Sequence, residues 1–282
     1  MSENSPEQRT EMFPKLWIRF FCVFCLLVVS AAVIAGKSGS RRKPEAEPAP
    51  PPPPTRVLMI GDSLSVGKFG EFVADYLVTR FGATNVALFA SCGSSPENWL
   101  RGEPDYFTKC GYRERTSTKS QYLDWANGKP PPHVRTPKVE DLIERYRPTV
   151  VIVQQGTNWM DGLAGSPSTK APEYREYARR FVAAILSGKR SVTRVVWIMP
   201  PDSSHFPPRV ESAAANIIEG AASGNRVDLI DSRRLTHYVS GKTGGDGIHY
   251  NSESSQAWAH KVTAELQSQL PEARYPSRGS TD

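Results

Sequence analysis

Short apolar runs alternate with amphipathic stretches between residues 56 and 270, and no other feature constrains the fold as strongly. Strands that are apolar on both faces are typical of parallel sheets with helices on either side. The expected strands are 56–60, 85–90, 148–156, 194–199 and 226–231, and the expected helices are 66–81, 138–147, 173–187, 210–219 and 253–270. The sequence therefore predicts an α/β fold with a central parallel sheet between two layers of helices.

Residues 96–137 interrupt this alternation. They are rich in Pro, Gly, aromatic and charged residues and show no sustained hydrophobic period. A connection of that length without secondary structure is usually functional or disordered in a compact domain. We therefore interpret residues 56–270 as one domain with an insert at 96–137, and we expect a disordered tail at 271–282.

The N-terminal segment, residues 1–36, contains an uncharged apolar run from Phe20 to Gly36, preceded by Lys15 and Arg19. About 17 such residues are near the lower limit for a membrane-spanning helix, and the small residues at the end of the run resemble a signal-cleavage site. The sequence predicts a single-pass anchor through residues 16–36 at the cell membrane, with the domain on the extracytoplasmic side. Secretion after signal cleavage is the alternative.

Residues 37–55 are expected to form a linker, because the stretch 43–55 is dominated by proline and adopts an extended polyproline conformation. A spacer is most useful between a retained membrane segment and a folded domain, which favours the anchor. From residue 56 onward, 28 Lys and Arg stand against 24 Asp and Glu. That balance does not indicate a nucleic-acid partner.

Two of the four cysteines, Cys22 and Cys25, lie in the apolar run, and Cys92 and Cys110 lie in the domain. Two cysteines in an exported domain allow one disulfide, and two buried free thiols are the alternative. The cysteine spacing matches neither a zinc nor an iron–sulfur site, so we expect no metal and no other cofactor.

Polar and small residues follow the expected strands, where parallel α/β sheets bind their ligands. Gly-Asp-Ser-Leu with Ser63 follows the first strand, Gly93 follows the second, and Gly-Thr-Asn with Asn158 follows the third. The stretch GGDGIHY, which contains Asp246 and His249, precedes the last helix. We expect these residues to converge at one edge of the sheet.

These residue types suit nucleophilic catalysis on an ester. A serine hydroxyl is a weak nucleophile until a base such as histidine takes its proton, and a carboxylate three residues earlier can hold the imidazole through Nδ1. The backbone N–H groups of Ser63 and Gly93 and the side-chain amide of Asn158 are candidate donors to the oxyanion of the tetrahedral intermediate.

The ordered motifs GDSL, isolated Gly, GTN and DxxH resemble those of the SGNH, or GDSL-type, hydrolase family across residues 56–270. The resemblance implies a flavodoxin-like three-layer α/β/α sandwich. It also implies a triad of Ser63, Asp246 and His249, with Ser63, Gly93 and Asn158 as oxyanion donors. The third motif often continues with Asp in the family, whereas Trp159 stands here, so substrates of relatives with that Asp do not transfer to this chain.

Each of these residues also has a structural interpretation. Ser63 could cap the following helix, and Asp246-Gly247 is a common turn dipeptide. Asp62 is expected to make a structural hydrogen bond, because its side chain should point away from that of Ser63. His205 is a second candidate base, and an exposed loop histidine is the favoured interpretation of it. The four motifs together favour the catalytic interpretation.

Aromatic residues stand near the strand ends and in the insert, namely Trp99, Tyr106, Tyr112, Trp125 and Trp159. Such rings can stack on sugars or pack the core of a small subdomain. Trp99 and Trp159 are our candidates for substrate contact.

The sequence thus predicts a membrane-anchored serine esterase that hydrolyses O-acyl esters, with O-acetyl favoured, of cell-envelope carbohydrate or peptidoglycan. An O-acyltransferase with the same triad, a lipid esterase and a non-catalytic envelope-binding module are the alternatives.

Overall fold

The computed structural model describes residues 54–187, 191–270 and 272. The predicted anchor and most of the predicted linker and tail lie outside these residues. None of the helices in the described part of the chain is long and apolar enough to cross a membrane.

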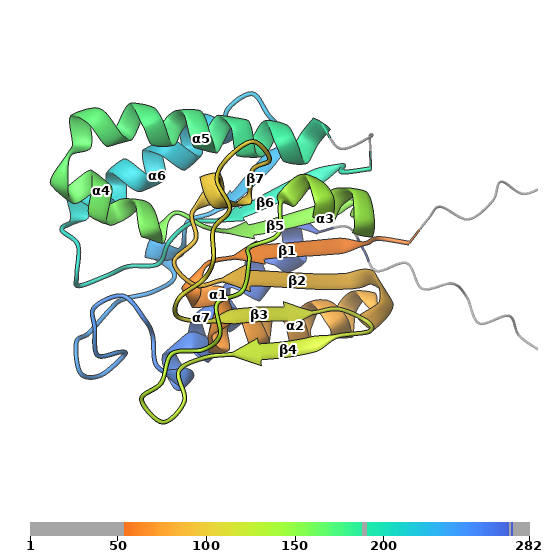
Figure 1. Ribbon diagram of the computed structural model, residues 1–282, viewed down its shortest axis with the longest axis horizontal. Coiled ribbons are helices and arrows are strands. Elements are labelled where there is room, and N and C mark those ends of the chain that lie inside the picture. The colour runs from red at the N-terminus through yellow and green to blue at the C-terminus, as the bar shows by residue number, and fades with distance from the viewer. Residues whose placement is uncertain (1–53, 188–190, 271, 273–282) are drawn as a thin grey trace, which may run out of the picture. The chain divides into compact units, whose positions relative to one another are not determined.

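Within residues 54–187 and 191–270, seven strands form one sheet in the order β4-β3-β2-β1-β5-β6-β7 (Figure 1). The strands are β1 (Val57–Gly61), β2 (Val86–Ser91), β3 (Tyr112–Arg115), β4 (Ser120–Leu123), β5 (Val150–Gln154), β6 (Arg194–Ile198) and β7 (Val227–Ile230). The five strands β2, β1, β5, β6 and β7 pair in parallel with their neighbours in this series. The predicted α/β fold with a mostly parallel sheet is confirmed.

Helices cover both faces of this sheet. They are α1 (Ser63–Val66), α2 (Lys68–Phe81), α3 (Val139–Tyr146), α4 (Met160–Gly165), α5 (Pro167–Ser187), α6 (Pro208–Ala222) and α7 (Ser252–Gln269). Side chains of β1 alternate between the two layers: Met59 packs in the cluster with α2 and α7, while Leu58 and Ile60 pack in the cluster with α3, α5 and α6. Continuous apolar strands follow from this arrangement, because both of their faces are buried.

The insert adds the two antiparallel strands β3 and β4 to the edge of the sheet, where the sequence predicted no strand. The strand β3 has no apolar period because its charged side chains are satisfied by polar groups, one of them distant in the sequence and one in the same hairpin. Arg113 Nε donates to the Val66 carbonyl at 2.7 Å, and Glu114 pairs with Lys119 at 2.6 Å. The helix α5 also begins at Pro167, earlier than predicted, and continues through Pro172.

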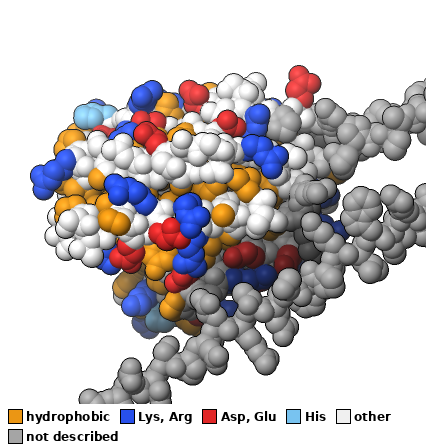
Figure 2. All heavy atoms as spheres, turned by 90° about the horizontal axis from the view of Figure 1, so that it is seen from above, with side chains coloured by type: hydrophobic (Ala, Val, Ile, Leu, Met, Phe, Trp, Pro, Cys, Tyr) orange, Lys and Arg blue, Asp and Glu red, His pale blue; other side chains and the backbone are white. Residues whose placement is uncertain are grey.

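Figure 2 shows a face on which Lys and Arg side chains are interspersed with Asp and Glu. On α5, Lys170 pairs with Glu173 at 2.8 Å and Arg179 with Glu176 at 2.6 Å. Exposed pairs of this kind stabilise a helix by only about 0.2–0.5 kcal/mol each. They keep opposite charges mixed along α5.

Candidate active site

Ser63 stands at the point where β1 gives way to α1. Gly61 ends the strand, and a Cβ there would lie 2.2 Å from the Cβ of Ser65, so only glycine permits this close turn. Asp62 caps α1 by accepting a hydrogen bond at 3.0 Å from the Leu64 N–H. The serine hydroxyl is thereby presented at the carboxyl edge of the sheet.

Asp62 is fully buried, and its hydrogen bond to the Leu64 N–H confirms the structural role expected for it. Burial raises the pKa of Asp62 to about 6, against the lowering effects of the Leu64 N–H and the nearby Gln154 side chain. Its carboxyl is engaged with the helix start, and no hydrogen bond from a histidine ring to Asp62 is found in the described residues.

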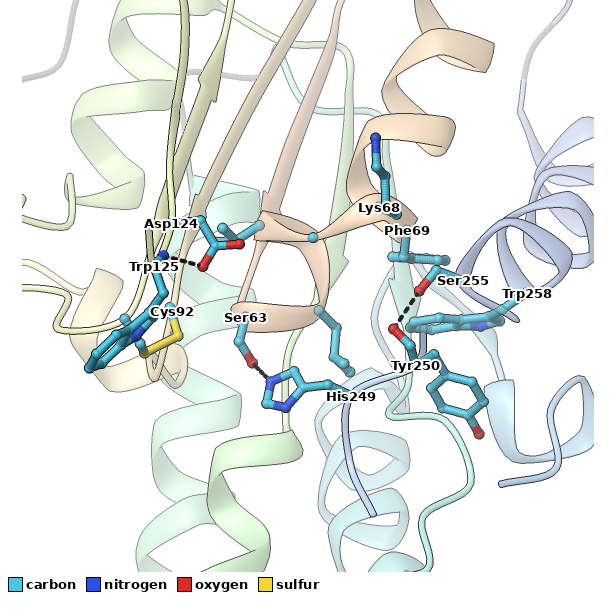
Figure 3. A pocket seen from close by; sticks show the side chains of 14 residues that line it. Ser63, Lys68, Phe69, Cys92, Asp124, Trp125, His249, Tyr250, Ser255 and Trp258 are labelled. Atoms are coloured by element: carbon cyan, nitrogen blue, oxygen red, sulfur yellow. Dashed lines mark hydrogen bonds between the residues drawn. A yellow bond between two sulfur atoms is a disulfide. The ribbon is translucent and has the colours of Figure 1, made fainter. Parts of the chain in front are cut away.

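Ser63, His249 and Asp246 form one hydrogen-bonded line. His249 Nε2 lies 2.9 Å from Ser63 Oγ, and His249 Nδ1 lies 2.6 Å from Asp246 Oδ2. Figure 3 shows the Ser63 side chain pointing at the imidazole. Two chain segments that are far apart in the sequence, the turn after β1 and the loop before α7, thus meet as the motifs predicted, and both ring nitrogens of His249 are engaged.

The second oxygen of Asp246 is held by the backbone. Oδ1 accepts the N–H of Ile248 at 2.9 Å and that of His249 at 2.7 Å. Partial burial alone would raise the pKa of Asp246, but the hydrogen bonds from the His249 ring and from these two N–H groups outweigh it and lower the pKa to about 2. Asp246 is therefore a fixed carboxylate beside the imidazole.

The loop between Asp246 and His249 is clamped through Gly247. The Gly247 carbonyl accepts three hydrogen bonds, from Ser203 Oγ at 2.7 Å, Ser204 N–H at 3.0 Å and His205 N–H at 3.3 Å. The Gly247 N–H donates to the Tyr238 hydroxyl at 2.9 Å. His205 is exposed and holds the loop through its backbone; within the described residues no carboxylate pairs with its ring.

Gly93 and Asn158 lie on segments that leave the sheet at the same edge as Ser63. Gly61 of β1 is in register with Ala90 of β2 and Gln154 of β5, so the segments that follow these three strands leave the sheet at one edge. Asn158 Nδ2 donates to the Ser94 carbonyl at 2.8 Å, which fixes one amide hydrogen and leaves the other to donate elsewhere. The backbone N–H groups of Ser63 and Gly93 have no acceptor among the described residues. Their role as oxyanion donors stays a prediction.

Cys92 and Cys110 form a disulfide, as expected from their number and setting. The bond ties the insert to the residue that precedes Gly93. Among the described residues, no three His, Cys, Asp or Glu side chains gather as a metal site would require.

The expectation that Trp99 and Trp159 contact substrate is wrong, because both indoles are fully buried. Trp99 Nε1 donates to Ser94 Oγ at 3.0 Å, and Trp159 Nε1 donates to Glu97 Oε2 at 3.0 Å. Trp159 also stacks on Tyr174. Both side chains support the loop after β2 from the interior of the fold.

A pocket of about 360 Å³ opens beside Ser63 and His249. Trp125 and the Cys92–Cys110 disulfide lie on one side of it, and Phe69 and Trp258 lie on the other (Figure 3). Trp125 is 55% exposed, which distinguishes it from the buried tryptophans. Nothing in the sequence distinguishes Trp125 from Trp99, because both are tryptophans of the same irregular insert.

The sequence from residue 57 to residue 262 matches the model of the family described as GDSL-like Lipase/Acylhydrolase. A search of curated proteins found no match. Three similar solved structures illustrate how distant the structural relatives are. A mutant of an acetyl esterase solved with an acetate ion has 14% identity, covers 76% of this chain and 97% of its own, and gives a TM-score of 0.51.

A lipase/acylhydrolase from Enterococcus faecalis has 16% identity, coverages of 78% of this chain and 100% of its own, and a TM-score of 0.49. A peptidoglycan O-acetylesterase has 11% identity, coverages of 77% and 91%, and a TM-score of 0.47. The first of the three shares the fold. Because the family model spans the chain from β1 into α7, including Ser63, Asp246 and His249, the chain belongs to the GDSL-like lipase/acylhydrolase family of ester hydrolases.

Proposed function

We propose that this chain is a serine esterase that removes O-acetyl groups from carbohydrate of the cell envelope, with Ser63, His249 and Asp246 as its catalytic residues. The observation that carries the proposal is the line from Ser63 Oγ to His249 Nε2 at 2.9 Å and from His249 Nδ1 to Asp246 Oδ2 at 2.6 Å, at the edge of an open pocket. This geometry suits proton transfer from a serine nucleophile to a histidine held in one tautomer.

In the first half-reaction, Ser63 Oγ attacks the ester carbonyl carbon while His249 Nε2 takes the hydroxyl proton. The oxyanion that forms is stabilised by the N–H groups of Ser63 and Gly93 and the Asn158 amide. The bond to the sugar oxygen then breaks, His249 returns the proton to that oxygen, and the acyl group remains on Ser63. Water repeats the sequence, releasing the carboxylic acid and the free serine.

The choice of carbohydrate rests on the mouth of the pocket. Trp125 presents an exposed indole there, and a rim formed by Lys68 and Asp124 is charged rather than aliphatic. The backbone at Trp125 is tied to its neighbours: Asp124 Oδ1 accepts the backbone N–H of Trp125 at 2.7 Å, and Asp124 Oδ2 accepts the Tyr122 hydroxyl at 2.6 Å. An exposed aromatic face beside polar groups suits a sugar ring better than an alkyl chain.

Replacing Trp125 by alanine is expected to lower kcat/KM for an O-acetylated oligosaccharide about 10-fold, which matches a stacking energy near 1.4 kcal/mol. Hydrolysis of p-nitrophenyl acetate should change less than about 2-fold, because this small substrate gains little from stacking on the Trp125 indole. The measurement is acetate release from both substrates by the full-length protein.

Phe107→Ala is the matched control, because Phe107 is a similarly exposed aromatic of the insert, 48% exposed, that does not line the pocket. An equal loss of activity on both substrates in Trp125→Ala would contradict stacking of the sugar on Trp125. Preference for long-chain acyl esters over the acetylated oligosaccharide would favour a lipid esterase. Acetylated product formed on an added sugar acceptor would favour acyl transfer.

We also propose that the domain works outside the cytoplasm, tethered through residues 16–36. The apolar run from Phe20 to Gly36 and the proline-rich spacer support a tether, and the Cys92–Cys110 disulfide suits an oxidising compartment. Membranes from cells producing the full-length protein should retain it after alkaline extraction, and added protease should digest the domain in intact spheroplasts. Recovery of the whole protein in the soluble fraction would contradict the tether.

A further inference from the structure

The turn that carries Gly93 has two possible orientations of its central peptide. Ser91 to Ser94 form this turn, closed by a hydrogen bond from the Ser94 N–H to the Ser91 carbonyl at 3.1 Å. Gly93, the third residue, has a φ of 78°, the value of a type II turn. Types I and II differ by a half-turn flip of the peptide between the second and third residues, which exchanges the sides of its C=O and N–H groups.

The carbonyl of that peptide belongs to Cys92, and Tyr106 holds it. The Tyr106 hydroxyl donates to the Cys92 carbonyl oxygen at 3.0 Å. Thr108 Oγ1 lies 3.2 Å from the same oxygen, but it is only 2.6 Å from the Gly111 carbonyl, and a hydroxyl has one proton to donate. Tyr106 is therefore the principal donor to Cys92. Burial raises the pKa of Tyr106, which keeps the phenol protonated.

Tyr106 and Gly93 also fit each other sterically. A Cβ on residue 93 would lie 2.4 Å from the Tyr106 hydroxyl oxygen, so the phenol occupies the space that any other side chain at position 93 would need. Glycine at position 93 is thus required both by its positive φ and by the tyrosine.

The direction of the Gly93 N–H follows from the carbonyl. In a trans peptide the N–H points to the side opposite the C=O. Sheet order places the insert strands on one side of β2 and β1, which leads to Ser63, on the other. A Cys92 carbonyl held by the insert therefore turns the Gly93 N–H toward the Ser63 side, and this N–H has no acceptor among the described residues.

We propose that Tyr106 is a positioning residue for the oxyanion site: by holding the Cys92 carbonyl it keeps the turn in its type II form and aims the Gly93 N–H at the oxyanion. The inference rests on the proposed esterase function. Without the phenol hydroxyl, part of the population adopts the flipped peptide, in which the Cys92 carbonyl oxygen, an acceptor, takes the place of the Gly93 N–H donor.

Tyr106→Phe in the full-length protein should lower kcat for p-nitrophenyl acetate by about 10- to 100-fold, less than the 10²–10³-fold typical of removing an oxyanion donor outright. KM should stay within about 2-fold, because the donor acts mainly in the transition state. Rates are expressed per active site, titrated to completion with a fluorophosphonate, so that unfolded protein does not count.

A boronic acid that forms a tetrahedral adduct on serine mimics the oxyanion intermediate. Its inhibition constant would not change if Tyr106 had a purely structural role. Its inhibition constant should rise in Tyr106→Phe by about the same factor as kcat/KM falls. Tyr76→Phe is the control, because it removes a half-buried hydroxyl on α2 that bonds Arg80 at 2.9 Å, away from the pocket. It should leave both quantities unchanged.

The inference is overturned if kcat per active site in Tyr106→Phe equals that of the wild type, or if kcat falls while the inhibition constant is unchanged. Failure of the proposed function looks different, because the wild-type protein would then hydrolyse no ester, or Ser63→Ala would retain the activity. The two failures are therefore separable in one set of assays.

Discussion

Replacing Ser63 by alanine is expected to lower kcat for p-nitrophenyl acetate by at least about 10⁴-fold, the scale on which loss of a triad nucleophile acts. The reason is that the hydroxyl 2.9 Å from His249 Nε2 is the atom that forms the acyl intermediate, and no other described hydroxyl bonds to that nitrogen. The fold should persist, because Ser63 makes no other side-chain hydrogen bond within the described residues. Initial rates of the full-length variant measure this effect.

Ser65→Ala is a stringent control because it lies two residues further on in the same short helix. The Ser65 hydroxyl is buried and donates to Gln154 Oε1 at 2.7 Å, away from the pocket. This variant should retain its rate per folded molecule while losing about 1 kcal/mol of unfolding free energy. A fluorophosphonate should label Ser65→Ala and leave Ser63→Ala unlabelled. Retention of more than about 1% of the wild-type rate in Ser63→Ala would remove the nucleophile assignment.

Asp246→Asn is the second change with a large expected effect, a fall in kcat of about 10⁴-fold. The backbone N–H groups of Ile248 and His249 fix one side-chain oxygen of residue 246, and the asparagine oxygen will take that place. The amide nitrogen must then face His249 Nδ1 and donate to it. That arrangement leaves the ring proton on Nε2, so the imidazole can no longer accept the proton of Ser63.

The pH dependence follows from the lowered pKa of Asp246, about 2. Because folding lowers this pKa, the ionised carboxylate stabilises the fold above about pH 4, and the contribution is lost as the pH falls toward 2. The side chain is 54% exposed, so solvent screens this contribution and it is small. Asp246→Asn should therefore unfold in urea much as the wild type does at pH 7, although its activity is nearly lost.

Asp228→Asn is the control for this substitution, because Asp228 is a surface carboxylate on β7 paired with Arg194 at 3.4 Å. It should keep full activity. If Asp246→Asn hydrolysed the ester at a rate within about 10-fold of the wild type, Asp246 would not be the residue that sets the tautomer of His249.

Local sequence patterns were sufficient to predict the parts of the fold and site that depend on local geometry. Continuous apolar strands specify a sheet buried on both faces, since no other arrangement covers both Leu58 and Met59. Asp246 and His249 are three residues apart, a spacing short enough for the carboxylate to reach the ring across one turn. The parallel order of the strands then brings Ser63 to the same edge.

The insert could not be predicted in the same way, because its elements are stabilised by distant partners. In β3, Arg113 is buried against the Val66 carbonyl, so a charged residue occupies a position that an alternating pattern would leave apolar. The bond from Tyr106 to Cys92 likewise joins residues whose proximity depends on how the insert folds back over β2.

The tryptophans show the difference between what local sequence patterns predict and what depends on contacts in the folded chain. The sequence by itself determined the parallel part of the sheet, its carboxyl edge and the residues Ser63, Asp246 and His249 that meet there. Only the tertiary structure decided that Trp99 and Trp159 are core residues and that Trp125 faces the pocket. The physical reason is that an indole is apolar wherever it stands, and its exposure depends on which elements of the folded chain cover it.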